Sequence, residues 1–276
     1  MRLALPSKGR LRDGCVELLT HAGYEIGALS GSGARAAIEG IEMIEMRPRD
    51  AAAALAVGQL DAAFLSTDIV TEHELDEYDA IPLGFSRCDL IVASREDDGR
   101  RSVADLAGAV VATHLPHTAE QFFTAQCVDV RVVAMGGSLE GVCAAGIADA
   151  IVDQRETGRS LDANRLRVLA EIAPCQAVFV RRDPEAFGDL VLRVEAALAA
   201  RRQRYVMLHL PKGRLDELRA MFPGLESPTV LPLAGRDDLV AVHLVVPVNE
   251  FWARLGDLRA LQATGIVAIA PEALLV

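Results

Sequence analysis

Short apolar runs alternate with amphipathic stretches through most of the first 182 residues. Helical patterns such as GRLRDGCVELLTHAG, AAAALAVG, AEQFFTAQ and SLEGVCAAG lie between most of the apolar runs. Strands separated by helices predict a largely parallel sheet with covered faces. The runs that predict strands are LALP near Leu3 and residues 41–46, 61–66, 88–94, 109–113, 130–135, 149–154, 166–172 and 177–182.

These strands are too numerous for one compact sheet, so the pattern favours two α/β lobes with a cleft between them. The segment PLGFSRCDLIVAS (82–94) suits a crossover from one lobe to the other. The strands near 166–182 would return the chain toward the first lobe. We therefore expect a first lobe at 1–87 plus 170–200 and a second lobe at 88–169.

The rhythm changes after a long helix that the pattern predicts over 184–204. The segments YVMLHL, KGRLDELRAMF, TVLPLA, LVAVHLVV, NEFWARLGDLRAL and GIVAIA then follow in the order β-α-β-β-α-β. This order is typical of a ferredoxin-like domain. We place that small third domain at 201–276.

Composition narrows the class of protein. A chain of 276 residues suits two or three domains. Its 28 basic and 39 acidic residues give a net charge of −11, which disfavours nucleic acid as a partner. No apolar run approaches the ~18 residues of a membrane span, and the apolar start MRLALP is too short for a secretory signal. We expect a cytoplasmic protein that does not bind membranes, and its five cysteines lack a CxxC pattern, which favours reduced thiols.

The stretch DAIVDQRETGRSL (149–161) carries the strongest chemical signal. Residues four apart in a strand face the same side, so Asp149 and Asp153 share a face. Asp153 lies toward the carboxyl end of that strand, where open α/β sheets bind ligands. Ribose hydroxyls or a magnesium ion would engage such acids.

The segment that follows has the composition of a phosphate-binding loop. Gly158 permits close backbone approach, Thr157 and Ser160 supply hydroxyls, and Arg159 supplies a charge. Acids beside such a loop favour a sugar phosphate or nucleotide over inorganic phosphate. The alternative is an ordinary loop that caps the next helix.

Beyond this loop, GGSLEG…GIADAIVDQRETGRSLDANRLRVL resembles the signature region of ATP phosphoribosyltransferase, the first enzyme of histidine biosynthesis. LALPSKGRL is similar to the family's opening strand and turn, and MRPRDAAAALAVGQLDAAFLSTDIVTE and THLPH match its next segments. The tail from RYVMLHLPKGRL to AVHLVVPVNEFW resembles the regulatory domain of the family's long form. The resemblance implies an α/β fold with two periplasmic-binding-protein-like lobes around a cleft and a C-terminal ACT-like domain.

The resemblance also implies an activity. Phosphoribosyl pyrophosphate would transfer its phosphoribosyl group to N1 of ATP, giving phosphoribosyl-ATP and pyrophosphate. Mg²⁺ would be carried by the substrate, with no protein ligand assigned. Positioning and electrostatic stabilisation suffice for such a transfer, so we assign no catalytic nucleophile.

Residue by residue, the resemblance assigns two ligand sites in the cleft. Phosphoribosyl pyrophosphate would contact Asp149, Asp153, Glu140, Glu156, Thr157, Gly158, Arg159, Ser160 and Leu161. ATP or pyrophosphate would contact Lys8, Gly9, Arg10, Arg47 and Arg49.

In the third domain, Ser227, Thr229 and His243 match positions where the long form binds feedback histidine. Turn chemistry and a satisfied strand histidine are the alternative. The resemblance further implies a homo-oligomer, a dimer or a hexamer. Two other functions stay open: a paralogue that uses another acceptor, and a non-catalytic ligand-sensing or regulatory protein.

Three departures from the family pattern bear on the cleft. Phe64 to Asp68 replace a glycine-containing loop, which would narrow the nucleotide pocket. His114 stands where a lysine is usual, so a fixed charge is lost. Arg165 replaces a glycine and would be strained if that position needs a positive φ. The acidic run Glu72 to Asp79 is expected to be a solvated face.

Overall fold

The computed structural model describes residues 1–29, 34–222 and 228–275. The chain divides into two compact units, one formed by residues 1–17 and 25–186 and the other by residues 18–24 and 187–276. Among the helices of these described residues, none is long and apolar enough to cross a membrane.

The first sheet has the strand order β2-β3-β1-β4-β11-β5. Strand β1 runs parallel to β3 and β4, whereas β2 is antiparallel to β3 and β11 is antiparallel to β4 and β5. The bounds are β1 (Arg2–Pro6), β2 (Arg35–Ile38), β3 (Ile41–Met46), β4 (Ala62–Ser66), β5 (Asp79–Pro82) and β11 (Ala177–Arg181).

The second sheet has the strand order β10-β6-β9-β7-β8. Strand β7 runs parallel to β8 and β9, whereas β6 is antiparallel to β9 and β10. The bounds are β6 (Cys88–Arg95), β7 (Val110–Thr113), β8 (Arg131–Ala134), β9 (Ala150–Arg155) and β10 (Leu166–Cys175).

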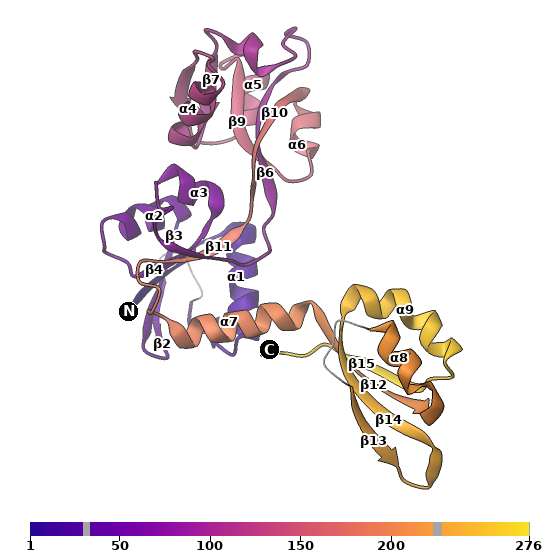
Figure 1. Cartoon of the computed structure of the whole chain (residues 1–276). Coiled ribbons are helices and arrows are strands. Elements are labelled where there is room, and N and C mark those ends of the chain that lie inside the picture. The colour runs from indigo at the N-terminus through magenta and orange to yellow at the C-terminus, as the bar shows by residue number, and fades with distance from the viewer. Residues whose placement is uncertain (30–33, 223–227, 276) are drawn as a thin grey trace. The chain divides into compact units, whose positions relative to one another are not determined.

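The prediction of largely parallel sheets is wrong for the strands that link the lobes. The chain passes from the first sheet to the second along β6 and returns along β10 into β11 (Figure 1). A strand that enters a sheet through such a link has no βαβ crossover to set it parallel to its neighbour. Strand β2 is antiparallel for a local reason, because Glu39 and Gly40 both have positive φ, of 48° and 81°, and form a two-residue hairpin turn.

The helices of this unit mostly follow the carboxyl ends of strands. Their N-termini therefore gather at the edges where those strands end, which is the ligand-binding edge of an open α/β sheet. The bounds are α1 (Gly9–His21), η1 (Ile26–Ala28), α2 (Pro48–Ala56), α3 (Thr67–Glu72), η2 (Val103–Leu106), α4 (Pro116–Ala125), α5 (Leu139–Ala144) and α6 (Arg159–Ala163).

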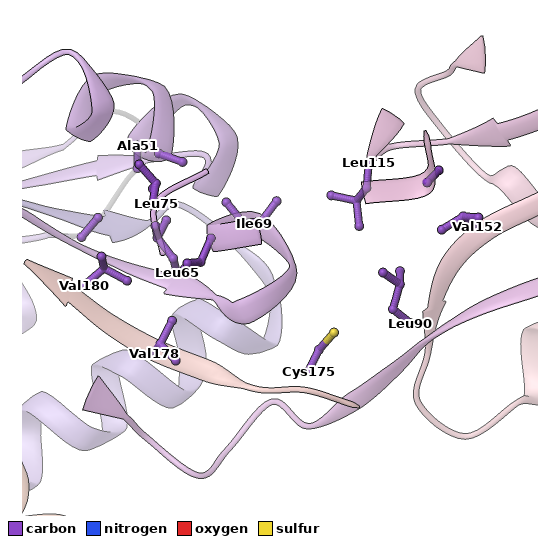
Figure 2. Close-up of a cluster of buried hydrophobic side chains, with 14 of the residues drawn as sticks. Ala51, Leu65, Ile69, Leu75, Leu90, Leu115, Val152, Cys175, Val178 and Val180 are labelled. Carbon is purple, nitrogen blue, oxygen red and sulfur yellow. The ribbon is translucent and has the colours of Figure 1, made fainter. Parts of the chain in front are cut away.

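One buried cluster draws side chains from both lobes of this unit. Leu65, Ile69 and Val178 come from the first lobe, and Leu90 and Val152 come from the second (Figure 2). Each fully buried side chain of this kind contributes roughly 1.5–3 kcal/mol relative to exposure. The cluster thus includes buried side chains from both lobes.

The C-terminal unit contains the expected ferredoxin-like order. Its sheet has the order β13-β14-β12-β15, with antiparallel neighbours throughout. The bounds are α7 (Gly188–Arg201), β12 (Gln203–Pro211), η3 (Lys212–Arg214), α8 (Leu215–Met221), β13 (Thr229–Leu233), β14 (Arg236–Pro247), α9 (Val248–Ala260) and β15 (Thr264–Ile269). Helix α7 is shorter than the predicted 184–204, because Gln203 and Arg204 already belong to β12.

The observed elements differ from the expected domain limits in two places. Strand β10 stays in the second sheet as far as Cys175, beyond the limit expected between residues 169 and 170. Helix α7 groups with the C-terminal unit, although residues 170–200 were expected with the first lobe. The division of the chain into functional domains stays a prediction.

Candidate functional site

A cleft of about 620 Å³ lies between the two lobes of the N-terminal unit. Its lining carries cationic side chains from the first lobe and carboxylates from both lobes, Asp50 and Asp68 from the first and Asp153 and Glu156 from the second. The lining residues are Ser7, Lys8, Arg10, Leu11, Arg47, Pro48, Arg49, Asp50, Ser66, Asp68, Ile69, Ser86, Cys88, His114, Leu115, Val152, Asp153, Gln154 and Glu156.

The cationic side is built at two helix starts. Lys8 and Arg10 flank Gly9, whose φ of +79° lets the chain turn from β1 into α1. Arg47 is the N-cap of α2, and Arg49 lies in its first turn behind Pro48. Backbone N–H groups at helix starts add positive potential to these side chains. This side of the cleft therefore suits an extended polyphosphate.

Two of these arginines reach across to the second lobe. Arg10 forms an ion pair with Glu156, and Arg49 donates a hydrogen bond to the backbone carbonyl of His114. Arg10 thus faces the loop that follows β9, and Arg49 faces the segment that follows β7.

Asp153 is the main carboxylate on the opposite side. It lies near the carboxyl end of β9, is half-buried, and lines the cleft. Burial is the largest influence on its carboxyl and raises its pKa to about 6, a hydrogen bond from the Gln154 N–H opposes this, and the nearby Glu140 and Asp68 carboxylates add to it. Asp153 is therefore a carboxylate that a cationic group or a hydroxyl donor in the cleft would stabilise.

The structure does not bring Asp149 into this cleft. Asp149 precedes β9 at its amino end, where it accepts hydrogen bonds from the Val110 N–H at 2.9 Å and from Arg100 at 3.0 Å. The hydrogen bond from Val110 is the largest influence on Asp149 and lowers the pKa of this carboxyl, and the charge of Arg100 adds to the effect. Asp149 lies outside β9, and a separation of four residues along an extended chain places the two acids about 13 Å apart.

The loop after β9 carries Glu156, Thr157 and Gly158 to the start of α6. Gly158 is the N-cap of α6 with a φ of 77°, a conformation that favours glycine. Thr157 and Arg159 are exposed. These features keep the loop's hydroxyl, charge and backbone N–H groups available to an anion.

Two predicted loop residues are engaged within the protein. Leu161 is 6% exposed and packs in an apolar cluster, so its side chain cannot contact a ligand. The Ser160 hydroxyl donates to Glu140 at 2.6 Å. Burial alone would raise the pKa of Glu140, but hydrogen bonds from Ser160, from its own N–H and from Ser138 outweigh burial and lower it. Glu140 thus holds the loop through Ser160.

A contact that sequence reasoning missed joins the lobes beside Asp153. Gln154 donates through its side-chain amide to Asp68 at 2.6 Å. Asp68 is 5% exposed, and its second carboxylate oxygen has no hydrogen-bond partner among the described residues. No local pattern in the sequence predicts this contact, because Gln154 and Asp68 lie in different lobes and 86 residues apart.

The acidic run also contains a structural residue that was not expected. Glu72 accepts hydrogen bonds from the backbone N–H of Thr118 and from its hydroxyl, each at 2.9 Å, at the start of α4. The prediction of a purely solvated face is therefore wrong at Glu72.

The three departures from the family pattern have different outcomes. Phe64 and Leu65 are buried in β4, so only Ser66 and Asp68 of that segment line the cleft. His114 lines the cleft, and its ring nitrogen Nε2 lies 3.2 Å from the Gly137 carbonyl oxygen. Arg165 has a φ of 53°, so this position does adopt the left-handed backbone.

In the C-terminal unit, Thr229 and His243 are directly opposed in the β13–β14 pair. The His243 Nδ1 lies 2.6 Å from the Tyr205 hydroxyl, so this histidine has a polar partner within the sheet. Ser227 lies outside the described residues. The structure thus brings together two of the three residues assigned to an effector.

Sequence profiles of known families match both units. A profile described as ATP phosphoribosyltransferase matches residues 47–196, and a profile described as the HisG C-terminal domain matches residues 200–272.

Relatives that match over the full length of the chain are also described as ATP phosphoribosyltransferases. ATP phosphoribosyltransferase from Gemmatimonas aurantiaca is 36% identical, with 100% of this chain and 99% of the relative covered. The corresponding protein of Maricaulis maris is 32% identical, with 100% and 98% covered. That of Methanocella arvoryzae is 30% identical, with 99% and 98% covered.

A solved structure agrees with the fold. A chain of the ATP phosphoribosyl transferase (HisG:HisZ) complex from Thermotoga maritima is 25% identical, with a TM-score of 0.59 and coverage of 71% of this chain and 96% of that chain. The expected fold class, two α/β lobes of the periplasmic-binding-protein type followed by a ferredoxin-like domain, is confirmed.

Proposed function

This chain belongs to the ATP phosphoribosyltransferase family, and we propose that its interlobe cleft holds both substrates of that reaction. The enzyme transfers the phosphoribosyl group of phosphoribosyl pyrophosphate to N1 of ATP, the first step of histidine biosynthesis. One observation carries the assignment of the site. Cations at two helix starts line a single cleft together with Asp153 and Glu156 of the second lobe.

The reaction needs stabilisation of charge more than it needs a nucleophilic side chain. The lone pair of ATP N1 forms the new bond to C1 of the ribose, and the bond from C1 to the pyrophosphate oxygen breaks. Positive charge develops on the ribose ring and negative charge on the leaving pyrophosphate. Fixed charges placed on both sides of that bond would lower the barrier.

The cleft residues divide into two roles on this basis. Lys8, Arg10, Arg47 and Arg49 would bind the pyrophosphate and the phosphates of ATP. Asp153 would accept hydrogen bonds from ribose hydroxyls and stabilise the positive ring. The pKa of about 6 leaves this carboxyl mostly ionised at pH 7, which that role requires.

The loop after β9 would hold the 5′-phosphate. Thr157 and Arg159 offer an exposed hydroxyl and an exposed guanidinium, and the backbone around Gly158 offers N–H donors. Glu140 would act on the loop by orienting Ser160. Asp149 is left out of this proposal, because it is bound to Arg100 at the other end of β9.

Magnesium would enter with the substrate. Among residues 1–29, 34–222 and 228–275, no group of three or more His, Cys, Asp or Glu side chains forms a metal cage. Mg²⁺ commonly binds one or two carboxylates together with substrate phosphates. Burial, with a smaller contribution from the Glu140 and Asp68 charges, raises the pKa of Asp153, so an added cation fits here, and the ion would neutralise charge on pyrophosphate.

The C-terminal domain would supply regulation. Thr229 and His243 lie side by side on one sheet and would bind histidine as a feedback inhibitor, in a homo-oligomer of two or six chains. Light scattering with and without histidine would test the assembly. Loss of inhibition in Thr229→Ala, with unchanged turnover, would support the effector site.

A steady-state assay tests the function itself. ATP, phosphoribosyl pyrophosphate and Mg²⁺ would be supplied with pyrophosphatase, and phosphoribosyl-ATP would be followed by its near-ultraviolet absorbance. Turnover that is lost in a variant lacking both Arg47 and Arg49 supports the proposed cleft. Full activity in that variant would contradict it.

A further inference from the structure

Two cysteines face each other where the lobes are joined. Cys88 is the first residue of β6, directly after the link from the first sheet, and Cys175 is the last residue of β10, directly before the return (Figure 1). The two residues are opposed as partners in the antiparallel β6–β10 pair. Cys175 lies at this crossing in the close-up of the buried cluster (Figure 2). Both are free thiols.

The spacing of opposed residues suits a covalent bond between them. Directly opposed Cα atoms in an antiparallel pair lie about 4.5–5.5 Å apart. A disulfide accepts Cα separations of about 4.4–6.8 Å. The backbone therefore places the pair within reach without a change of register.

The two thiols differ in their exposure to solvent. Cys88 is partly exposed and lines the 620 Å³ cleft, whereas Cys175 is 4% exposed. Both also line a neighbouring cavity of about 400 Å³, and Cys88 is the more exposed of the two thiols.

Their acidities differ in the same sense. The hydrogen bond with Cys175 is the largest influence on Cys88 and lowers its pKa, although burial and the Asp68 and Asp89 charges oppose this. The same hydrogen bond, together with burial, raises the pKa of the Cys175 thiol. Cys88 is thus the more readily ionised member of the pair, and thiolates are the reactive form.

We propose that Cys88 and Cys175 form a reversible disulfide when the protein meets a peroxide, and that this bond fixes the two strands joining the lobes. The Cys88 thiolate attacks one peroxide oxygen, the O–O bond breaks, and Cys88 becomes a sulfenic acid. The departing hydroxide takes up the proton that the Cys88 thiol released on ionisation and leaves as one water. The Cys175 sulfur then attacks the Cys88 sulfur and expels the hydroxyl as a second water. The two sulfurs lose two electrons in total, and those electrons reduce the peroxide.

The bond would restrain the two segments that connect the lobes. Closure of two lobes around a ligand is absorbed by a few residues in the connecting segments. A cross-link between the first residue of β6 and the last of β10 would remove freedom from both connections at once. This functional consequence rests on the proposed interlobe site, whereas formation of the bond does not.

Peptide mass analysis tests the bond directly. Trypsin releases Cys88 in the peptide CDLIVASR and Cys175 in the peptide VLAEIAPCQAVFVR. After treatment of the full chain with hydrogen peroxide and alkylation of remaining thiols, these two peptides should appear joined and lack two hydrogens. A reductant should separate them. The joined peptide should be absent from Cys88→Ser and Cys175→Ser, whose folding is checked by circular dichroism.

Cys127→Ser is the matched control, because Cys127 is an exposed thiol outside the cleft. It should form the cross-link as the original protein does and retain its activity. If peroxide oxidises Cys88 to sulfinic acid, or joins Cys127 to another chain, while peptides 88–95 and 168–181 stay separate, the proposal is overturned.

Activity supplies the second readout. Oxidised protein should lose turnover several-fold and regain it with reductant, and Cys175→Ser should show no reversible loss. Unchanged turnover in protein that mass analysis shows to be fully cross-linked would overturn the hinge effect. Absence of turnover in the reduced protein would count against the enzyme site and leave the mass result standing.

Discussion

The two ends of β9 hold the same residue type in opposite circumstances. Asp149, before the strand, accepts hydrogen bonds from a backbone N–H and from Arg100, and its pKa is lowered. Asp153, near the other end, is half-buried beside Glu140 and Asp68, and its pKa is raised to about 6. Asp149 is paired with an arginine of the protein, whereas Asp153 accepts a hydrogen bond from the Gln154 N–H and is the carboxylate that we propose contacts the ribose.

On the proposed function, the acid at one end of β9 serves stability and the acid near the other end serves the reaction. An ionised group with good partners strengthens the folded state, whereas one held among like charges weakens it. Perturbed carboxylates in clefts are typical of functional sites. The contrast between Asp149 and Asp153 therefore makes predictions of opposite sign for the same substitution.

The largest effect should be on turnover. Asp153→Asn keeps the size of the side chain but removes the charge that would stabilise the ribose ring, so kcat/KM should fall roughly 100- to 1,000-fold. Asp149→Asn is the matched control and should stay within a few-fold of the original enzyme. Equal losses in the two variants would show that the two ends do not differ in function.

Stability should change in opposite directions. The raised pKa of Asp153 means that its ionised form destabilises the fold above pH 6, a penalty that disappears as pH falls through about 6 toward the unfolded value. Asp153→Asn should therefore stabilise the protein at pH 7 by about 2 kcal/mol.

Asp149→Asn should instead destabilise the protein. The lowered pKa of Asp149 means that its contribution is present above the unfolded pKa and is lost as pH falls through the folded one. Loss of its charged hydrogen bonds should cost about 1–2 kcal/mol at pH 7. Denaturant unfolding measures whether each substitution raises or lowers the free energy of unfolding. A loss of stability in Asp153→Asn would contradict the comparison.

The pH dependence should separate the two acids further. Ionised Asp153 is required, so kcat/KM should decline below pH 6 by about tenfold per pH unit. Asp149→Asn should retain this decline of kcat/KM below pH 6. Asp153→Asn should retain only the part due to the substrate phosphates, which also titrate near pH 6. An identical profile in all three proteins would show that Asp153 does not control it.

The smallest effect should be a change in stability at a residue other than Asp149 and Asp153. Arg165 has a φ of 53°, and Arg165→Gly should stabilise the fold by about 0.5–1 kcal/mol by relieving this conformation. Arg165→Ala removes the same charge but keeps the strain, so it should show no gain. Thermal unfolding compares the two, and similar values would mean that charge and not backbone conformation governs this position.

The apolar pattern predicted the cleft and its main carboxylate because both follow from local rules. Strand β9, its carboxyl end and the glycine-containing turn after it are readable from alternation and turn chemistry. The role of Asp149 could not be predicted from the sequence, because its partner Arg100 is distant in sequence. In addition, two residues on one face of a strand can lie too far apart to contact the same ligand. The same limit explains why the Gln154–Asp68 contact was missed, since it joins segments that meet only when both lobes are formed.

The missed elements have a related cause. Strands β2 and β5 are short, so their periodicity is weak. The antiparallel placement of β6 and β11 depends on how the chain crosses between lobes. Local patterns contain no information on that crossing.

Calorimetry of phosphoribosyl pyrophosphate binding tests the central claim about Asp153 most directly. Binding with Mg²⁺ at pH 6 would be measured in buffers of different ionisation enthalpy, which reveals protons released on binding. Asp153 is about half protonated at that pH and should lose its proton to form the complex. The account predicts proton release that falls in Asp153→Asn and persists in Asp149→Asn. Undiminished release in Asp153→Asn would contradict it.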